Sequence, residues 1–401
     1  MKQGWEIKKL VEVCKIGDGN HSSKYPKSAE MTPSGIPFIR ANNMVNGKVC
    51  WDDMKFITNE KHSILKKGHL RAGDILFTNR GEIGKIAIVG SEFDNSNLNS
   101  QIAWLRCFEI LNNKFLYYLL LSPLMSNHFL IEKNGAALQQ FTIKQINELL
   151  IPIPPLPEQE RIVSILDQVF SAIEQAKANA EKNLKNAKEL FDSYLTSVFT
   201  NKGHAWEEKT LGEVCVVERG SSPRPIDNFL TNSEDGVNWI KIGDTKGIDK
   251  YLYKTKEKIT KEGAQKSRFV KEGDFILSNS MSFGKPYIMK TKGYIHDGWF
   301  VLRLPSNIHP EFFWYLLASP YTMSQFIGLA SGAIVKNISG DLVKKTKLPI
   351  PPFEEQKEIA QKLDALSAET KQLEVIYQLK LTELEDLKKS ILQKAFNGEL
   401  I

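Results

Sequence analysis

Cysteine is scarce in this sequence, and long apolar segments are missing. Four cysteines occur in 401 residues, far apart along the chain: Cys14, Cys50, Cys107 and Cys215. Their spacing argues against a disulfide framework or a zinc knuckle, so we expect reduced, mostly buried thiols. The longest apolar run, residues 115–121, is much shorter than the roughly 20 residues that a membrane span needs. No apolar segment of an export signal follows the first lysines, so we expect a cytoplasmic protein.

Motifs of catalysis are also missing. Residues 81–85 (Gly-Glu-Ile-Gly-Lys) lack the length of a phosphate-binding loop and the hydroxyl that follows its lysine. Residues 17–19 lack the third glycine of a dinucleotide site. An amino-methyltransferase carries Asn or Asp before Pro-Pro-Tyr/Phe, whereas Ile350 occupies that place here. The seven histidines show no spacing of metal ligands. We therefore predict no catalytic residue and no bound metal.

The chain consists of one unit written twice. Residues 153–159 (Ile-Pro-Pro-Leu-Pro-Glu-Gln) return at 350–356 as Ile-Pro-Pro-Phe-Glu-Glu-Gln, 197 residues later. The pattern Ser193-x-Leu195-x-x-x-Phe199 returns at the same offset, and Gly-Asp at 73–74 returns at 273–274. An internal repeat decides the organisation of the whole chain.

Each copy begins with a predicted strand-rich α+β domain. Short apolar runs broken by Gly, Pro and Asn predict strands near residues 36–40, 74–78 and 86–89 in the first copy. The matching runs of the second copy are residues 239–242, 274–278 and 300–304, and a helix is expected over 310–318. We place the two globular domains at residues 1–150 and 204–347.

Each domain is followed by a segment that predicts a long helix, residues 151–203 and 348–401. After Pro-Pro, apolar residues recur at steps of three and four for about forty residues without proline. This spacing indicates one narrow apolar stripe along the helix, the seam, through which it can pair with another helix. Such a helix is about 60 Å long. Because the second helix must run back to pair with the first, we predict an antiparallel coiled coil with one domain at each end and a pseudo-twofold axis.

Positive charge is concentrated in the two domains. Residues 1–150 hold 19 Lys and Arg against 14 Asp and Glu, and residues 206–347 hold 21 against 16. The helical segments are slightly acidic. This distribution favours a polyanion as the partner of the domains and protein as the partner of the helices. Ordinary solubilising lysines would give the same excess.

The loops of both domains carry side chains suited to DNA. Arg and Lys match guanine edges, Asn and Gln match adenine, and hydroxyls match phosphates. In the first domain the candidate DNA-binding residues are Ser22, Ser23, Lys24, Tyr25, Arg40, Asn42, Asn43, Asn79, Arg80, Lys85, Gln139 and Gln140. In the second domain they are Ser221, Ser222, Arg224, Lys241, Asn279, Ser280, Lys285, Lys336 and Asn337, with Asp244 beside them. The loops mostly differ between copies, so the domains should recognise different half-sites, although ordinary solvated loops would have the same composition.

Over its whole length the chain resembles the specificity subunits of type I restriction-modification enzymes. The resemblance rests on the signature Pro-Ile-Pro-Pro-Leu/Phe-x-Glu-Gln at 152–159 and 349–356, and on the two Ser-x-Leu-x-x-x-Phe motifs. It implies a non-catalytic subunit that binds an asymmetric, bipartite DNA sequence. Each domain would recognise one half, and the antiparallel helices would set the length of the unspecified gap.

The resemblance also implies partners. Two modification subunits, which bind S-adenosylmethionine and methylate adenine, would dock on the helices, and restriction subunits that use ATP and Mg²⁺ would join them. Four apolar side chains outside the seam are candidates for these contacts: Leu156, Phe170, Leu190 and Phe353. They could equally pack on their own domains.

Two other functions compete with this hypothesis. The chain could be a non-catalytic scaffold whose two domains bind proteins or glycans across a coiled-coil spacer. It could also be an enzyme by itself, which the missing motifs disfavour. A steep salt dependence of DNA binding distinguishes DNA recognition from a protein scaffold.

Overall fold

The computed structural model describes residues 3–20, 24–131, 140–279, 284–330 and 339–400. Contacts divide the chain into two compact units, Met1–Ala180 with Leu379–Ile401, and Glu181–Gln378. Each unit therefore combines one strand-rich domain with parts of two long helices, α6 (Leu156–Thr200) and α12 (Phe353–Phe396). No helix in the described part of the chain has the length and apolar character that crossing a membrane requires.

The first unit contains three sheets. A six-stranded sheet has the order β2-β10-β7-β8-β5-β4, a three-stranded sheet has the order β6-β3-β9, and β1 pairs with β11. The strands are β1 (Glu6–Lys9), β2 (Cys14–Asp18), β3 (Ile36–Ile39), β4 (Met44–Val45), β5 (Lys48–Val49), β6 (Lys55–Ile57), β7 (Ile75–Thr78), β8 (Ile86–Ile88), β9 (Asn97–Leu98), β10 (Ile102–Cys107) and β11 (Leu150–Ile153). The helices are α1 (Leu10–Val13), α2 (Asn59–Ile64), α3 (Asn113–Leu121), α4 (Pro123–Ile131) and α5 (Ile143–Glu148).

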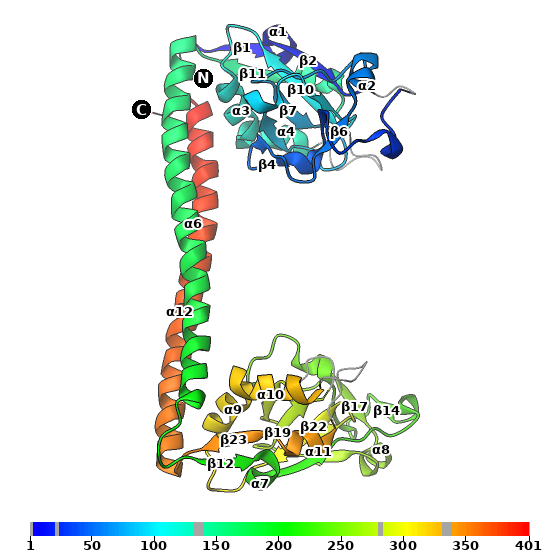
Figure 1. Cartoon of the computed structure of the whole chain (residues 1–401), viewed down its shortest axis with the longest axis vertical. Helices are drawn as coiled ribbons and strands as arrows, with labels where there is room; N and C mark the ends of the chain where they lie inside the picture. Colours follow the sequence, from blue (N-terminus) through cyan, green and yellow to red (C-terminus); the bar gives the residue numbers. More distant parts are fainter. Residues whose placement is uncertain (1–2, 21–23, 132–139, 280–283, 331–338, 401) are drawn as a thin grey trace. The chain divides into compact units, whose positions relative to one another are not determined.

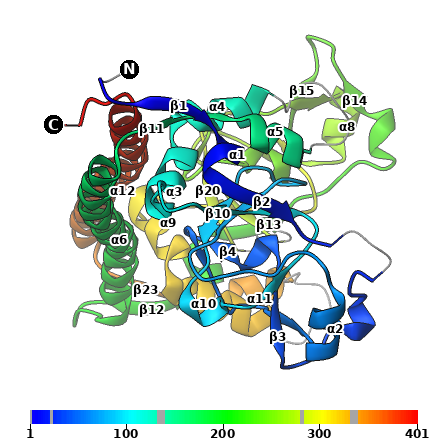
Figure 2. The ribbon, with the colours of Figure 1, turned by 90° about the horizontal axis from the view of Figure 1, so that it is seen from above.

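Both faces of the central sheet of the first unit are buried. Successive side chains of a strand point to opposite faces. Accordingly Ile75 and Phe77 of β7 join the core that α3 and α4 cover, while Leu76 joins a second core on the other face. Both views place α3 on the side of this unit that faces α6 and α12 (Figures 1 and 2). The unbroken apolar run of β7 is what a strand covered on both faces requires.

The second unit repeats this construction. Its sheets have the orders β13-β22-β19-β20-β16, β14-β17-β15-β21-β18 and β12-β23. The strands are β12 (Glu207–Thr210), β13 (Val216–Arg219), β14 (Leu230–Thr231), β15 (Val237–Ile240), β16 (Tyr251–Leu252), β17 (Glu257–Ile259), β18 (Arg268–Val270), β19 (Phe275–Ser278), β20 (Pro286–Met289), β21 (Gly293–Ile295), β22 (Trp299–Arg303) and β23 (Lys347–Ile350). The helices are α7 (Leu211–Val214), α8 (Lys261–Gln265), α9 (Pro310–Ala318), α10 (Pro320–Ala330) and α11 (Gly340–Lys344). In β19, Phe275 and Leu277 join one core and Ile276 the other, as in β7.

Each long helix begins directly after a strand that closes its domain. β11 pairs antiparallel with β1, and β23 pairs antiparallel with β12. In the second pair, Glu208 binds Lys202 at 2.8 Å and Lys347 at 2.9 Å. Hydrogen bonds and charge attraction from these two lysines lower the pKa of Glu208 to about 2. The first strand of each domain thus holds the segment from which its long helix starts.

Within each unit the two long helices run antiparallel, as the sequence predicts. In the first unit Glu174 pairs with Lys388 at 3.4 Å and Lys177 pairs with Glu385 at 2.8 Å, so positions rise along α6 as they fall along α12. In the second unit the end of α6 shares a core with the start of α12. The predicted fold is confirmed, with two strand-rich domains, one long helix between them in the chain and a second long helix after the second domain.

The Ser-x-Leu-x-x-x-Phe motif anchors the far end of each helix. Phe396, at the end of α12, packs on Phe115 of α3 with ring centroids 5.3 Å apart. Phe199, at the end of α6, packs on Phe312 of α9 at 5.8 Å. Each domain therefore buries the last turn of the helix that started from the other copy.

Two cysteines that are distant in sequence are neighbours in the fold. β2 and β10 place Cys14 opposite Cys107, with the two sulfur atoms 3.8 Å apart. All four thiols are free, and Cys14 and Cys215 are buried. The sulfur contact with Cys107 and burial raise the pKa of Cys14, and burial raises the pKa of Cys215 to about 12. The linear spacing of the cysteines concealed this close pair.

Candidate nucleic-acid interface

The backbone bonds that flank the turn between β7 and β8 recur between β19 and β20 of the second domain. Thr78 donates its backbone N–H to Lys85 O at 3.0 Å, and Ser278 donates to Lys285 O at 3.2 Å. Gly84 closes the first turn with φ +99°, a left-handed value that favours glycine, and its counterpart in the second turn has φ +77°. The side chains on this shared backbone differ. Lys85 pairs with Glu82 at 2.8 Å, whereas Lys285 is exposed.

Arg80 and Gln140 come together beside this turn. The two residues form an isolated antiparallel bridge, although sixty positions separate them. With its amide oxygen turned toward Arg80, Gln140 accepts from the guanidinium Nε at 3.2 Å and Nη2 at 3.0 Å. Two of the predicted DNA-binding residues therefore form one polar group at the surface. Gln139 lies outside the described residues.

Arg40 directly follows β3 and binds Asp53, a carboxylate of the loop between β5 and β6. Arg40 donates from Nη2 to Asp53 Oδ2 at 2.9 Å, and Asn42 donates to the same oxygen at 3.2 Å. Hydrogen bonds from Lys55 and Arg40 lower the pKa of Asp53, so its carboxylate stays charged. Asn43 accepts from Arg40 N at 3.0 Å and donates to the backbone of the next loop, which fixes the short helix that follows β3.

The second domain repeats this arrangement with different residues. Lys241 donates its backbone N–H to Asp244 Oδ2 at 2.8 Å, as Arg40 does to Asn43. The side chain of Lys241 forms an ion pair with Glu257. A buried cap thus holds the same turn in both domains, while the half-buried basic group changes from guanidinium to ammonium.

Three predicted residues of the second domain converge on Asp297. Ser222 donates to its Oδ1 at 2.8 Å, Arg224 to its Oδ2 at 3.1 Å, and Asn279 to its backbone oxygen at 2.9 Å. Burial raises the pKa of Asp297, but the hydrogen bond from Ser222 and the charges of the neighbouring His296 and Arg224 outweigh it, so the pKa is lowered. Arg224 is otherwise exposed and is held toward solvent by this carboxylate.

The remaining predicted residues are more scattered. Lys24 is exposed, and Tyr25 is half-buried against Phe38 with ring centroids 5.8 Å apart. Ser221 donates its hydroxyl to Lys266 O at 3.0 Å. Five further residues lie, like Gln139, outside the described residues: Ser22, Ser23, Ser280, Lys336 and Asn337.

Three of the predicted asparagines form part of the frame and are not at the surface. Asn43 is 0% exposed, and Asn79 and Asn279 are each 2% exposed. The amides of Asn43 and Asn279 already bind backbone oxygens. Because a buried, hydrogen-bonded amide cannot reach a base edge, Asn43 and Asn279 are corrected to structural roles, and Asn79 is corrected on its burial alone.

The predicted partner-binding residues differ in how far their side chains are exposed. Phe170 packs against Tyr118 with ring centroids 5.3 Å apart and is only 7% exposed, so its assignment to a partner surface is wrong. Leu156 and Leu190 are exposed, and Phe353 is half-buried. These three remain candidates for partner contacts.

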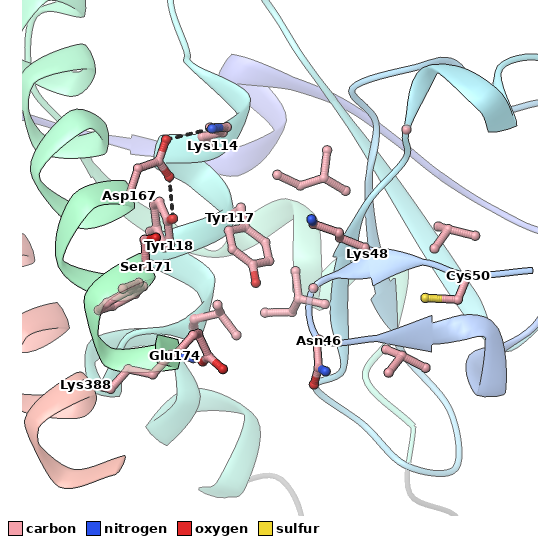
Figure 3. A pocket seen from close by; sticks show the side chains of 18 of the residues that line it. Asn46, Lys48, Cys50, Lys114, Tyr117, Tyr118, Asp167, Ser171, Glu174 and Lys388 are labelled. Carbon is pink, nitrogen blue, oxygen red and sulfur yellow. Dashed lines mark hydrogen bonds and ion pairs between the residues drawn. The ribbon is translucent and has the colours of Figure 1, made fainter. Parts of the chain in front are cut away.

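A groove of the first unit lies between its domain and its part of the long helices. The cavity has a volume of about 1210 Å³ and is lined by the β4–β5 hairpin, α3, α6 and α12. Figure 3 shows Asn46 and Lys48 on one side and Tyr117, Tyr118 and Asp167 on the other. The second unit has a smaller groove of about 440 Å³ at the matching place. In the part of the chain that the structure describes, no three His, Cys, Asp or Glu side chains cluster as metal ligands would.

Asp53 and Asp297 are the site residues that sequence reasoning missed. Each is the acceptor that orients an arginine of its domain. Neither has a recognisable motif, and each meets its arginine through the fold, at separations of 13 and 73 residues.

Comparison with known proteins agrees with this architecture. The family model described as type I restriction modification DNA specificity domain matches residues 2–183 and 204–381. The EcoKI specificity subunit of Escherichia coli (strain K12) is 24% identical over 428 residues, covering 100% of this chain and 90% of that protein.

Two solved structures have the same fold. One, from work on complex assembly and conformational transition of the type I R-M system, has a TM-score of 0.81 at 23% identity and covers 100% of this chain and 99% of its own. The HsdS subunit from Thermoanaerobacter tengcongensis has a TM-score of 0.67 at 23% identity, with 99% and 98% covered. With both copies of the repeat matched by one family model, the chain belongs to the family of type I restriction modification DNA specificity domains.

Proposed function

We propose that this chain is the DNA-recognition subunit of a type I restriction-modification complex. Each strand-rich domain binds one half of an asymmetric, bipartite DNA site, and the paired helices set the gap between the halves. The chain itself is non-catalytic and acts in the cytoplasm.

One observation carries the proposal most directly. Two domains share the same frame of turns and caps but present different polar side chains on it, such as Arg40 against Lys241. A shared frame with different surface groups is what recognition of two different base sequences requires, because base edges are distinguished by donors and acceptors at set positions. The carboxylates Asp53 and Asp297 orient the arginines before DNA arrives.

The helices provide the partner surface of this proposal. Leu156 and Leu190 are apolar side chains that remain exposed on α6. Two modification subunits, carrying S-adenosylmethionine and methylating adenine, dock on the helices, and restriction subunits using ATP and Mg²⁺ complete the complex. This chain contributes placement, since the bound DNA is held where the modification subunit acts on a flipped adenine.

Sequencing of methylated adenines in the host genome tests the proposal. The expected result is one asymmetric motif in two parts separated by a fixed, unspecified gap, which disappears when the gene of this chain is deleted. As a biochemical companion, DNA binding by the assembled complex should fall steeply with salt, because phosphate contacts release counterions. A motif without two parts, or binding that is insensitive to salt, contradicts the proposal.

A further inference from the structure

A buried glutamine ties the start of each long helix to its domain. Gln159 is 0% exposed, and every polar group of its amide is bound within the chain. Its Oε1 accepts from the backbone N–H of Asn112 at 2.8 Å. Its Nε2 donates to Ile110 O at 3.0 Å and to Pro154 O at 2.8 Å. One side chain thus joins the loop before α3, the strand that ends the domain and the first turn of α6.

The second copy contains the same tie. Gln356 is 1% exposed, and its Oε1 accepts from the backbone N–H of His309 at 2.8 Å. Its Nε2 donates to Asn307 O at 3.3 Å and to Pro351 O at 2.9 Å. The bonds join the loop before α9, the end of β23 and the first turn of α12. The local sequences of the two loops differ, so the bonds depend on the glutamine and on backbone atoms.

A second tie lies eight residues further along each helix. Tyr118 of α3 donates its hydroxyl to Asp167 Oδ1 at 2.5 Å, and Figure 3 shows this bond beside the one from Lys114. In the second copy Tyr315 of α9 donates to Asp364 Oδ1 at 2.7 Å. Eight helical residues correspond to about 12 Å along the axis. Two attachment points at this separation fix the direction of a helix as well as its starting position.

The glutamine amides and the tyrosine hydroxyls already have their hydrogen-bond partners within the chain. Both glutamines are buried, and each tyrosine hydroxyl is already bound to a carboxylate of the long helix that packs on its domain. Simple filling of a core does not explain them, because apolar side chains of similar size would fill the space without the need for three matched acceptors and donors. The same hydrogen bonds thus hold each long helix to its domain in the same way in both copies.

We propose that Gln159 and Gln356, together with the pairs Tyr118–Asp167 and Tyr315–Asp364, are positioning residues for gap selection. They fix the direction in which each long helix leaves its recognition domain, and this direction sets the distance and the rotation at which the second half-site can be bound. The inference rests on the proposed function, since gap selection exists only if the two domains bind one bipartite site.

The test compares gap lengths with variants of the ties in the complete complex. Tyr118→Phe combined with Tyr315→Phe removes only two hydroxyls and keeps both rings, and Gln159→Leu removes a whole amide. Tyr253→Phe is the matched control, because Tyr253 is 64% exposed and its hydroxyl makes no hydrogen bond to a helix among the described residues. Thermal unfolding shows whether each variant folds. If Gln159→Leu does not fold, the double tyrosine variant alone tests the inference.

Initial methylation rates are measured on duplexes that carry the two half-sites at the native gap, one base pair shorter and one base pair longer. The wild-type and Tyr253→Phe complexes should prefer the native gap. In the tie variants the ratio of native to altered-gap rates should fall by about fivefold, while base preferences within each half-site stay unchanged.

A variant that is slower on all duplexes by the same factor would overturn the inference, because a residue needed only for folding changes total activity without changing the ratio. An unchanged ratio at full activity would overturn it as well. If the wild-type complex shows no bipartite motif, the proposed function itself fails, which is a different outcome from a wild-type gap preference that the variants retain.

Discussion

Replacing Phe396 by alanine should destabilise the first domain, although Phe396 belongs to the second copy of the repeat. Its ring lies at the end of α12, is 4% exposed and packs on Phe115. The same substitution at Phe199, which is 0% exposed and packs on Phe312, should destabilise the second domain. Each substitution should thus destabilise the domain that belongs to the other copy of the repeat.

The expected magnitude follows from burial. Truncation of a buried phenylalanine to alanine costs about 3–5 kcal/mol, because apolar contact is lost and a cavity remains. Since 1.4 kcal/mol corresponds to tenfold, the protection of backbone amides in the affected domain should fall by roughly two to three and a half powers of ten. Leu387→Ala is the control on the same helix, because Leu387 is 46% exposed and its truncation should cost less than about 0.5 kcal/mol.

Hydrogen exchange followed by mass spectrometry provides the assay. In Phe396→Ala, protection should fall in β7 and β10 and stay unchanged in β19 and β22. In Phe199→Ala the result should be the reverse. If Phe396→Ala loosened β19 and β22 instead, the reciprocal packing of the two helix ends would be wrong. Equal loss in both domains would also contradict the assignment of each helix end to one domain.

Three further predictions concern charge, thiols and recognition. Because two lysines lower the pKa of Glu208 to about 2, its carboxylate stabilises the fold above the unfolded-state value of 4.5, and this contribution is lost as pH falls toward 2. Glu208→Gln should therefore reduce the loss of stability between pH 4.5 and pH 2 in denaturant titrations. Cys50 should react with a thiol reagent at pH 8, whereas Cys215, with its pKa raised by burial to about 12, should react only after unfolding, as counted by absorbance. Arg40→Ala and Arg224→Ala should each cost about 1–3 kcal/mol of DNA binding and relax a different part of the methylated motif, as measured by competition binding and adenine sequencing.

Elements with a strong pattern could be predicted from sequence alone. The structure confirms the helix expected over 310–318 as α9, the expected strand at 74–78 as β7, and the two long helices after Pro-Pro. These elements follow from apolar periodicity and from proline at a helix start, which are local properties of the chain. The repeat added the antiparallel direction of the helices, because the second helix starts from the domain that follows the first helix and must run back to pair with it.

Features that depend on distant contacts could not be predicted in this way. Phe170 looked free because it lies one position beside the seam, but Tyr118 of α3 covers it. Asn43 looked like a donor for adenine, yet it caps a turn inside the domain. Two of the three bonds of Gln159 join segments almost fifty residues apart, so the recurring Glu-Gln signature was visible while its purpose was not.

In the proposed function, each domain recognises its own half of one DNA site. Exchanging residues 206–347 for the corresponding domain of a relative, followed by sequencing of methylated adenines, tests this claim most directly. One part of the motif should change while the other part and the gap are retained. A change in both parts, or in neither, would contradict it.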